Sequence, residues 1–109
     1  MEVRFTKGFI KEMKKHLSRA EALSIIKKLS NTNPSEGKII SIIGDIVLKE
    51  KKLKSFRFYF VFRQANILFM NERELRERIL LFIQISKKNN QQRVIEKLIE
   101  DLKKNGFRI

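Results

Sequence analysis

The sequence predicts a small α+β domain in which a mainly antiparallel sheet carries its helices packed on one face. Three observations support this class. A short alternating segment leads into helical periodicity, a central region alternates with a period of two residues, and an amphipathic helix closes the chain. The chain has 109 residues, which is the size of one domain, so we expect residues 1–109 to form a single domain.

The N-terminal third predicts a strand followed by a helical hairpin. Residues 2–5 alternate between polar and apolar side chains, and apolar residues then recur at helical spacing over 9–17. Ser18 followed by Glu21 fits a capping box, which predicts that a second helix begins there. The run NTNPSEG (31–37) has the composition of a loop.

The middle of the chain predicts successive strands. Residues 39–43 are rich in isoleucine, and residues 44–45 (Gly-Asp) break the pattern. Residues 46–53 and 55–62 then predict two further strands with a tight turn near Lys52. This order is typical of hairpin-connected antiparallel strands.

The C-terminal part predicts a strand and a helix. Residues 67–70 favour one more strand, 72–78 a helical turn, and 79–85 a buried strand. Apolar residues over 94–102 trace one helical face, and Gly106 is placed to end that helix.

The strand SFRFYFVF carries the main functional prediction, because alternate side chains of a strand lie on opposite faces. One face consists of phenylalanines: Phe56, Phe58, Phe60 and Phe62. The other face consists of Arg57, Tyr59, Val61 and Arg63. Phenylalanines at period two are typical of core, so we expect them beneath the helices, with Arg57 and Tyr59 on an open face.

An alternative interpretation of the same strand is an RNA-recognition motif, in which exposed aromatics stack on bases. KSFRFYFV (54–61) is superficially similar to the pattern of that motif. However, Ser55 and Arg57 fill both glycine positions, and the order of elements differs. The sequence therefore favours core phenylalanines and a working face built around Arg57.

Charge and composition restrict the kinds of partner and chemistry. The chain has 25 Lys+Arg against 12 Asp+Glu, a formal net charge of +13, which indicates nucleic acid, an anionic membrane surface or an acidic protein as partner. It has no cysteine and one histidine, His16, so we expect no disulfide, no metal site and no cofactor. No apolar run reaches the roughly 18 residues of a membrane span, and the N-terminus does not resemble a secretory signal, so we expect a soluble cytoplasmic protein.

Two basic clusters are candidates for contacts with RNA phosphates. The first, in KEKKLKSFR (49–57), comprises Lys49, Lys51, Lys52, Lys54 and Arg57. The second comprises Lys87, Lys88 and Arg93, and it lies where the last helix begins and offers free backbone N–H groups. The alternative for the first cluster is a hairpin tip whose lysines discourage pairing between sheet edges.

These segments resemble the RelE/HigB-like toxin superfamily, especially its phage Gp49-like branch. Phe56-Arg57-Phe58-Tyr59 is similar to the Tyr-Arg-hydrophobic-Tyr pattern of that group, and Leu48-Lys49 stands near its Glu-Leu-Arg-like triplet. FIQISKKNNQQRVIEKLIEDLKKNG (82–106) resembles its last strand, basic loop and amphipathic helix. The resemblance covers essentially the whole chain in the order of its elements.

The resemblance implies a RelE-like fold and metal-independent mRNA cleavage, on the ribosome or on free mRNA, neutralised by an acidic antitoxin protein. It implies catalytic roles for Arg57, Tyr59 and Lys49, and nucleic-acid contacts from a wider set. That set is Lys51, Lys52, Lys54, Arg63, Lys87, Lys88 and Arg93. A phosphate clamp needs only charge, whereas Tyr59 as an acid or base needs neighbouring cations to lower its pKa.

Two further functional hypotheses remain open from the sequence. One is a non-catalytic nucleic-acid-binding domain on the same scaffold, as a decayed toxin or a regulator. The other is a protein-interaction module whose basic groove receives an acidic helix. Cleavage of RNA, RNA binding without cleavage, and binding of an acidic partner distinguish the three.

Overall fold

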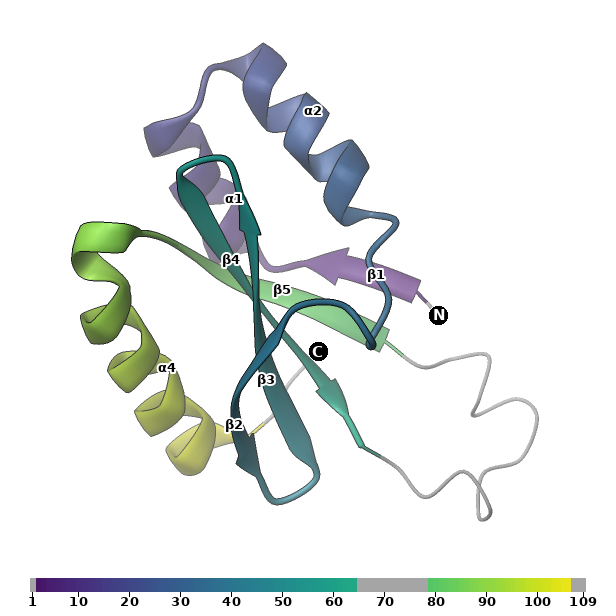
Figure 1. Ribbon diagram of the computed structural model, residues 1–109, viewed down its shortest axis with the longest axis vertical. Coiled ribbons are helices and arrows are strands. Elements are labelled where there is room, and N and C mark those ends of the chain that lie inside the picture. Colours follow the sequence, from purple (N-terminus) through teal and green to yellow (C-terminus); the bar gives the residue numbers. More distant parts are fainter. Residues whose placement is uncertain (1, 65–78, 107–109) are drawn as a thin grey trace.

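The computed structural model describes residues 2–64 and 79–106 and has an α+β architecture (Figure 1). Its elements are β1 (Glu2–Phe5), α1 (Lys7–His16), α2 (Arg19–Leu29), β2 (Lys38–Ile43), β3 (Ile46–Leu53), β4 (Phe56–Arg63), β5 (Ile79–Lys87), a 3₁₀ turn (Lys88–Asn90) and α4 (Gln91–Asn105). The strand predicted over 67–70 and the helical turn predicted over 72–78 lie outside the described residues. The other predicted elements are confirmed within a few residues at each end.

The five strands form one mixed sheet in the order β1-β5-β4-β3-β2. β1 pairs with β5 in parallel, from Glu2 opposite Ile79 to Phe5 opposite Phe82, and the other three pairs are antiparallel. The prediction of a mainly antiparallel sheet is thus corrected to a mixed sheet. Alternation of side chains is the same in both kinds of pairing, so the sequence pattern does not reveal the direction of β1 relative to β5.

The helical hairpin of α1 and α2 covers one face of the sheet. Phe58, Phe60 and Phe82 are completely buried there and pack with Phe9 of α1 and Leu29 of α2. The prediction that the phenylalanines of β4 form core beneath helices is confirmed, because all four of them belong to this cluster. Each such ring contributes about 1.5–3 kcal/mol through burial.

Helix α4 covers the opposite face, where Leu98 and Leu102 pack on Leu48, Tyr59 and Val61. Figure 1 shows α4 and the α1–α2 hairpin on different sides of the sheet. The prediction that all helices share one face, with the other face open, is therefore wrong. The reason is physical: both faces of the central strands are apolar, and an amphipathic helix needs an apolar surface on which to bury its stripe.

Local signals at the helix ends behave as the sequence predicts. Ser18 caps α2 through its hydroxyl, which accepts from Glu21 N at 3.2 Å, while Glu21 Oε1 accepts from Ser18 N at 3.2 Å. At the end of α4, Gly106 adopts φ 70° and its N–H donates to Leu102 O at 2.9 Å. The β3–β4 turn lies at residues 54–55, two residues beyond the predicted position near Lys52.

The position of Gly37, just before β2, has no room for a side chain. Gly44 provides a comparison, because its backbone is similar but its surroundings are open. Both have positive φ, 80° and 61°, but a Cβ at Gly37 would lie 2.7 Å from Glu50 O, whereas a Cβ at Gly44 meets nothing within 4 Å. We predict that Gly44→Ala lowers the free energy of unfolding by about 1–2 kcal/mol and Gly37→Ala by about 3 kcal/mol or more. Urea titration of the two variants measures both values, and equal losses would contradict the proposed backbone clash.

Candidate nucleic-acid interface

Polar side chains gather at one end of the sheet, where the β3–β4 turn, the end of β5 and the start of α4 meet. In the strand register Lys52 lies opposite Arg57, and Arg57 lies opposite Ser86. Alternation puts these three side chains on the face covered by α4, at the end of the sheet reached by its first turn. Pairing between strands thus brings together residues that are up to 34 positions apart in the sequence.

Arg57 is held by a buried carboxylate. Its Nε lies 3.2 Å from Glu50 Oε1, and the two residues are each only 8% exposed. Gln91, in the first turn of α4, donates from Nε2 to both carboxylate oxygens of Glu50 at 3.0 Å. Glu50 therefore links the arginine on the sheet to the helix above it, and it orients the guanidinium.

A small part of the Arg57 side chain, 10%, remains exposed. Neither Nη atom of Arg57 donates a hydrogen bond to another residue, yet no buried side-chain nitrogen in the described chain lacks a partner. Both Nη atoms therefore retain contact with solvent. The expectation that Arg57 lies on an open face is therefore wrong, since its side chain is only 10% exposed. A guanidinium is nevertheless the planar fork that binds phosphate in bidentate fashion.

Tyr59 does not lie on an open surface. It is completely buried beneath α4, and its hydroxyl shares a hydrogen bond of 2.8 Å with Ser86 Oγ. Burial raises the pKa of the phenol above its ordinary value of 10.0, and the nearby Glu50 carboxylate acts in the same direction. The expectation of an exposed tyrosine activated by neighbouring cations is therefore wrong for this structure.

Lys49 and Lys51 lie on the face opposite Arg57, because the strand alternates. Lys49 Nζ donates to Pro34 O at 2.6 Å and to Glu36 O at 3.2 Å, and Lys51 Nζ donates to Thr32 Oγ1 at 3.1 Å. Lys49 is only 7% exposed. The structure thus does not bring Lys49 together with Arg57 and Tyr59, and both lysines fasten the loop before β2.

The remaining predicted cations divide between two ends of the sheet. Lys52, Lys54, Lys87 and Lys88 are exposed at the turns beside Arg57, but Lys87 lies opposite Phe56 in the register and so is on the other face of the sheet from Arg57. Lys87 Nζ stands 5.7 Å from the centre of the Phe56 ring, a cation–π distance. Arg63 lies at the other end of β4, where Nη1 pairs with Asp45 Oδ2 at 3.1 Å, so it belongs to a different surface.

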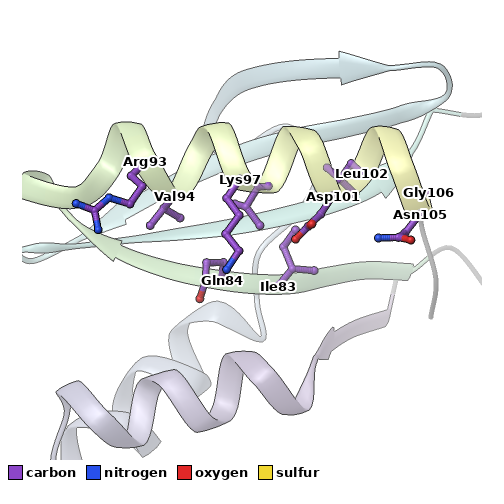
Figure 2. A pocket seen from close by; sticks show the side chains of 10 residues that line it. Ile83, Gln84, Arg93, Val94, Lys97, Asp101, Leu102, Asn105 and Gly106 are labelled. Atoms are coloured by element: carbon purple, nitrogen blue, oxygen red, sulfur yellow. The ribbon is translucent and has the colours of Figure 1, made fainter.

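Arg93 lines a separate groove of about 540 Å³ between α4 and β5 (Figure 2). Figure 2 shows Lys97 reaching from α4 toward Gln84 of β5, with Asp101 one turn further along the helix. Two cations and one carboxylate thus line a groove whose floor includes Ile83. The geometry provides a second weakly basic surface beside the helix.

The structure brings His16, at the end of α1, to the same end of the molecule as Lys87. The two residues line a cavity of about 90 Å³ together with Glu12 and Asn90. His16 Nε2 lies 3.8 Å from Glu12 Oε2. No local pattern signals this placement, since it follows from the packing of α1 against β5.

Ser86 and Gln91 are further residues that sequence reasoning missed. Ser86 lies opposite Arg57 once the β4–β5 register is known, and Gln91 reaches Glu50 only after α4 docks. Across residues 2–64 and 79–106, no three His, Cys, Asp or Glu side chains form a group that could hold a metal ion. In the same part of the chain, no helix has the length and apolarity to cross a membrane.

Comparison with known proteins identifies the architecture. A chain of the crystal structure of the archaeal RelE–RelB complex from Pyrococcus horikoshii OT3 superposes with a TM-score of 0.53 at 15% sequence identity, covering 80% of this chain and 93% of that one. The chain has a RelE-like fold. No family model matches the sequence, and no curated protein matches it significantly.

The buried state of Tyr59 predicts its titration. Because its pKa is raised in the folded protein, the RelE-like fold loses stability as pH rises above about 10, where the unfolded chain ionises first. Tyr59 is the only tyrosine and the chain has no tryptophan, so phenolate absorbance reports this group alone. We expect a midpoint above that of the urea-unfolded protein, and an identical midpoint would contradict the buried phenol.

The variant Lys49→Met distinguishes a structural role of Lys49 from a catalytic one. We predict that Lys49→Met lowers the free energy of unfolding by about 2 kcal/mol, because two carbonyl oxygens lose a charged donor. Denaturant titration measures this loss. If the variant remains folded, we expect its rate of RNA cleavage to match that of Lys51→Met. A selective loss of RNA cleavage in Lys49→Met would establish the catalytic role that the family resemblance implies.

Proposed function

We propose that this protein is a toxin-like endoribonuclease of a type II toxin–antitoxin system, which cleaves mRNA in the cytoplasm without a metal ion. The substrate phosphate binds Arg57 at the end of the sheet, and Lys52, Lys54, Lys87 and Lys88 contact neighbouring phosphates. The RelE-like fold supports the class of protein. Fold alone does not determine a reaction, so the proposal depends on the site.

The observation that carries the proposal is the arrangement of Arg57. Its Nε lies 3.2 Å from Glu50 Oε1, its side chain keeps 10% exposure, and exposed lysines stand at the neighbouring turns. A pre-oriented guanidinium stabilises the charge that develops on a phosphorane during strand cleavage. The large positive charge of the chain, +13, draws RNA toward this end at low ionic strength.

In this proposal Arg57 binds the phosphate, whereas Tyr59 and Lys49 have structural roles. Tyr59 positions the end of β5 through Ser86, and Lys49 fastens the loop before β2. Neither is a proton donor or acceptor at the phosphate in the described arrangement.

A second candidate function is RNA binding without cleavage on the same surface. The burial of Tyr59 favours it, because the phenol is both enclosed and harder to ionise. On this hypothesis Arg57 and the lysines bind the RNA backbone, and no group supplies the proton transfers that strand cleavage needs. Affinity is then strongly dependent on salt while the RNA remains intact.

An acidic antitoxin protein is the partner that the proposal implies. Support comes from the similar structure, which is that of a RelE–RelB complex, and from the excess of cations on this chain. Neutralisation then requires the partner to cover or to distort the Arg57 end. Coexpression with a neighbouring acidic reading frame should restore growth in cells that this protein arrests.

Arg57→Ala tests the site. We predict discrete cuts in RNA by the wild-type protein in the presence of EDTA, and a loss of about 10²-fold or more in the cleavage rate of the variant. Lys103→Ala on α4 removes the same charge far from the site and should change the rate less than twofold, an estimate consistent with screening of exposed charges.

Two further variants control for loss of the fold and for effects on RNA binding rather than on cleavage. Arg57→Ala leaves Glu50 buried without its cation, so Arg57→Lys, which keeps the charge but not the fork, is measured beside it with thermal melts of both. Lys52→Ala should reduce the slope of log affinity against log salt by about 0.7. Intact RNA with strong, salt-dependent binding supports the second candidate, and full activity of Arg57→Ala overturns the site.

A further inference from the structure

Strand β2 forms one edge of the sheet, and its outer side pairs with no strand within residues 2–64 and 79–106 (Figure 1). Such an edge presents backbone N–H and C=O groups that another strand can bind. Ile39 and Ile42 of β2 are 54% and 55% exposed, and among the described large apolar side chains only Leu23 is more exposed. The edge of β2 therefore offers backbone groups and apolar side chains together.

A β-bulge places the two exposed isoleucines on the same face of β2. In a regular strand, residues three positions apart lie on opposite faces. The register with β3 shifts between Ile39 and Ser41, so that Ile39 lies opposite Lys49 and Ile42 opposite Val47. The core cluster beneath α1 and α2 includes Val47 but neither isoleucine. The two side chains thus form an apolar strip that the helical hairpin leaves uncovered.

We propose that β2 pairs in antiparallel fashion with β2 of a second copy of this chain, so that two sheets join across a two-fold axis. Residues that lie opposite each other in such a pair must share a face of the joined sheet. Pairing Ile39 with Ile42 of the second copy satisfies this condition, and the symmetry repeats the contact. Lys38 then lies opposite Ile43, which shares its face. The two bulges face each other, so each residue of β2 has a counterpart.

The charges at the two ends of β2 are complementary in this register. Lys38 begins the strand, and Asp45 follows it in the turn to β3 with a side chain that is 55% exposed. Because Lys38 lies opposite Ile43 of the second copy, it stands two residues from the Asp45 of that copy. Asp45 pairs with Arg63 of its own chain at 3.1 Å, and a carboxylate has acceptor sites for a second cation. Opposite charges thus meet at both ends of the pair, and isoleucines meet between them.

A second copy fits this edge better than RNA or an unrelated strand. RNA would meet one cation within β2, Lys38, and would leave the isoleucines exposed. An unrelated strand would have to reproduce the bulge, the apolar strip and the charges, whereas another β2 supplies all three. β2 contains none of the residues assigned to the phosphate, so the inference stands whether or not the protein cleaves RNA.

Sedimentation velocity of the full chain, freed of nucleic acid by RNase, tests the association from micromolar to millimolar concentration. We expect a monomer–dimer equilibrium whose Kd rises about tenfold or more in Ile42→Ser, because each dimer loses two apolar contacts. Added salt should tighten the dimer, since two chains of formal charge +13 repel each other, whereas salt weakens binding to RNA.

Leu23→Ser is the matched control for Ile42→Ser. Leu23 belongs to α2, is 60% exposed, and lines a groove between α1 and α2 whose rim holds Lys14 and Arg19. Its replacement should leave the Kd of the dimer unchanged. Both serine variants replace exposed side chains, and thermal melts of each establish that the fold persists.

Introduced cysteines test the register, because the chain has none of its own. Opposite residues of an antiparallel pair have Cα atoms about 4.5–5.5 Å apart, which a disulfide can bridge. A mixture of Ile39→Cys and Ile42→Cys proteins should therefore oxidise to a dimer in which the two positions are joined. Each variant alone should cross-link about tenfold less, since its own two cysteines lie beyond the roughly 7 Å limit of a disulfide. Peptide mass spectrometry identifies the bridged residues.

Several outcomes overturn the proposal. A chain that stays monomeric at all concentrations, equal losses in Ile42→Ser and Leu23→Ser, or cross-linking of the single cysteine variants as efficient as that of the mixture would each do so. A dimer that RNase dissociates would assign the association to bridging RNA. A dimer broken by Leu23→Ser but kept in Ile42→Ser would assign the contact to the helical hairpin.

Discussion

The rest of the structure depends on the placement of β4 between β3 and β5 with both of its faces covered. Its phenylalanines point to the α1–α2 hairpin, and Tyr59 and Val61 point to α4. A strand in this position must satisfy two cores with one alternating sequence, and FRFYFVFR does so by placing aromatic rings on one side and a mixed set on the other. Arg57 is a candidate phosphate-binding residue because it lies at the end of the face that α4 covers.

The buried ion pair explains how a charged residue is kept near the core of a basic protein. Removing Arg57 and Glu50 from water is costly, and the cost falls when the remaining acceptor sites are filled. Gln91 donates to both oxygens of the carboxylate, so the position of α4 and the orientation of Arg57 depend on each other. A ligand at the guanidinium would therefore act on the junction between sheet and helix.

The positive charge of the chain serves several surfaces. Lys49 and Lys51 are used within the fold, as bonds to the loop before β2. Arg57 with the exposed lysines forms one basic end, and the hairpin rim of Lys14 and Arg19 forms another around an apolar lining. The first surface consists mainly of cationic side chains, while the second places cations around apolar side chains. Net charge alone does not distinguish these uses.

The sequence by itself determined the order of most elements, the capping of α2 by Ser18, the end of α4 at Gly106 and the division of β4 by parity. These features depend on local spacing and on hydrogen bonds between near neighbours, which a pattern can reveal. Tertiary structure decided the rest: the parallel pairing of β1, the docking of α4 over Tyr59, and the separation of Lys49 from Arg57. The two residues lie on neighbouring strands and in one charge run, but the period of two sends them to opposite faces. The contacts of Glu50 with Arg57 and Gln91 arise only when distant segments pack, because no local spacing encodes which face a helix covers.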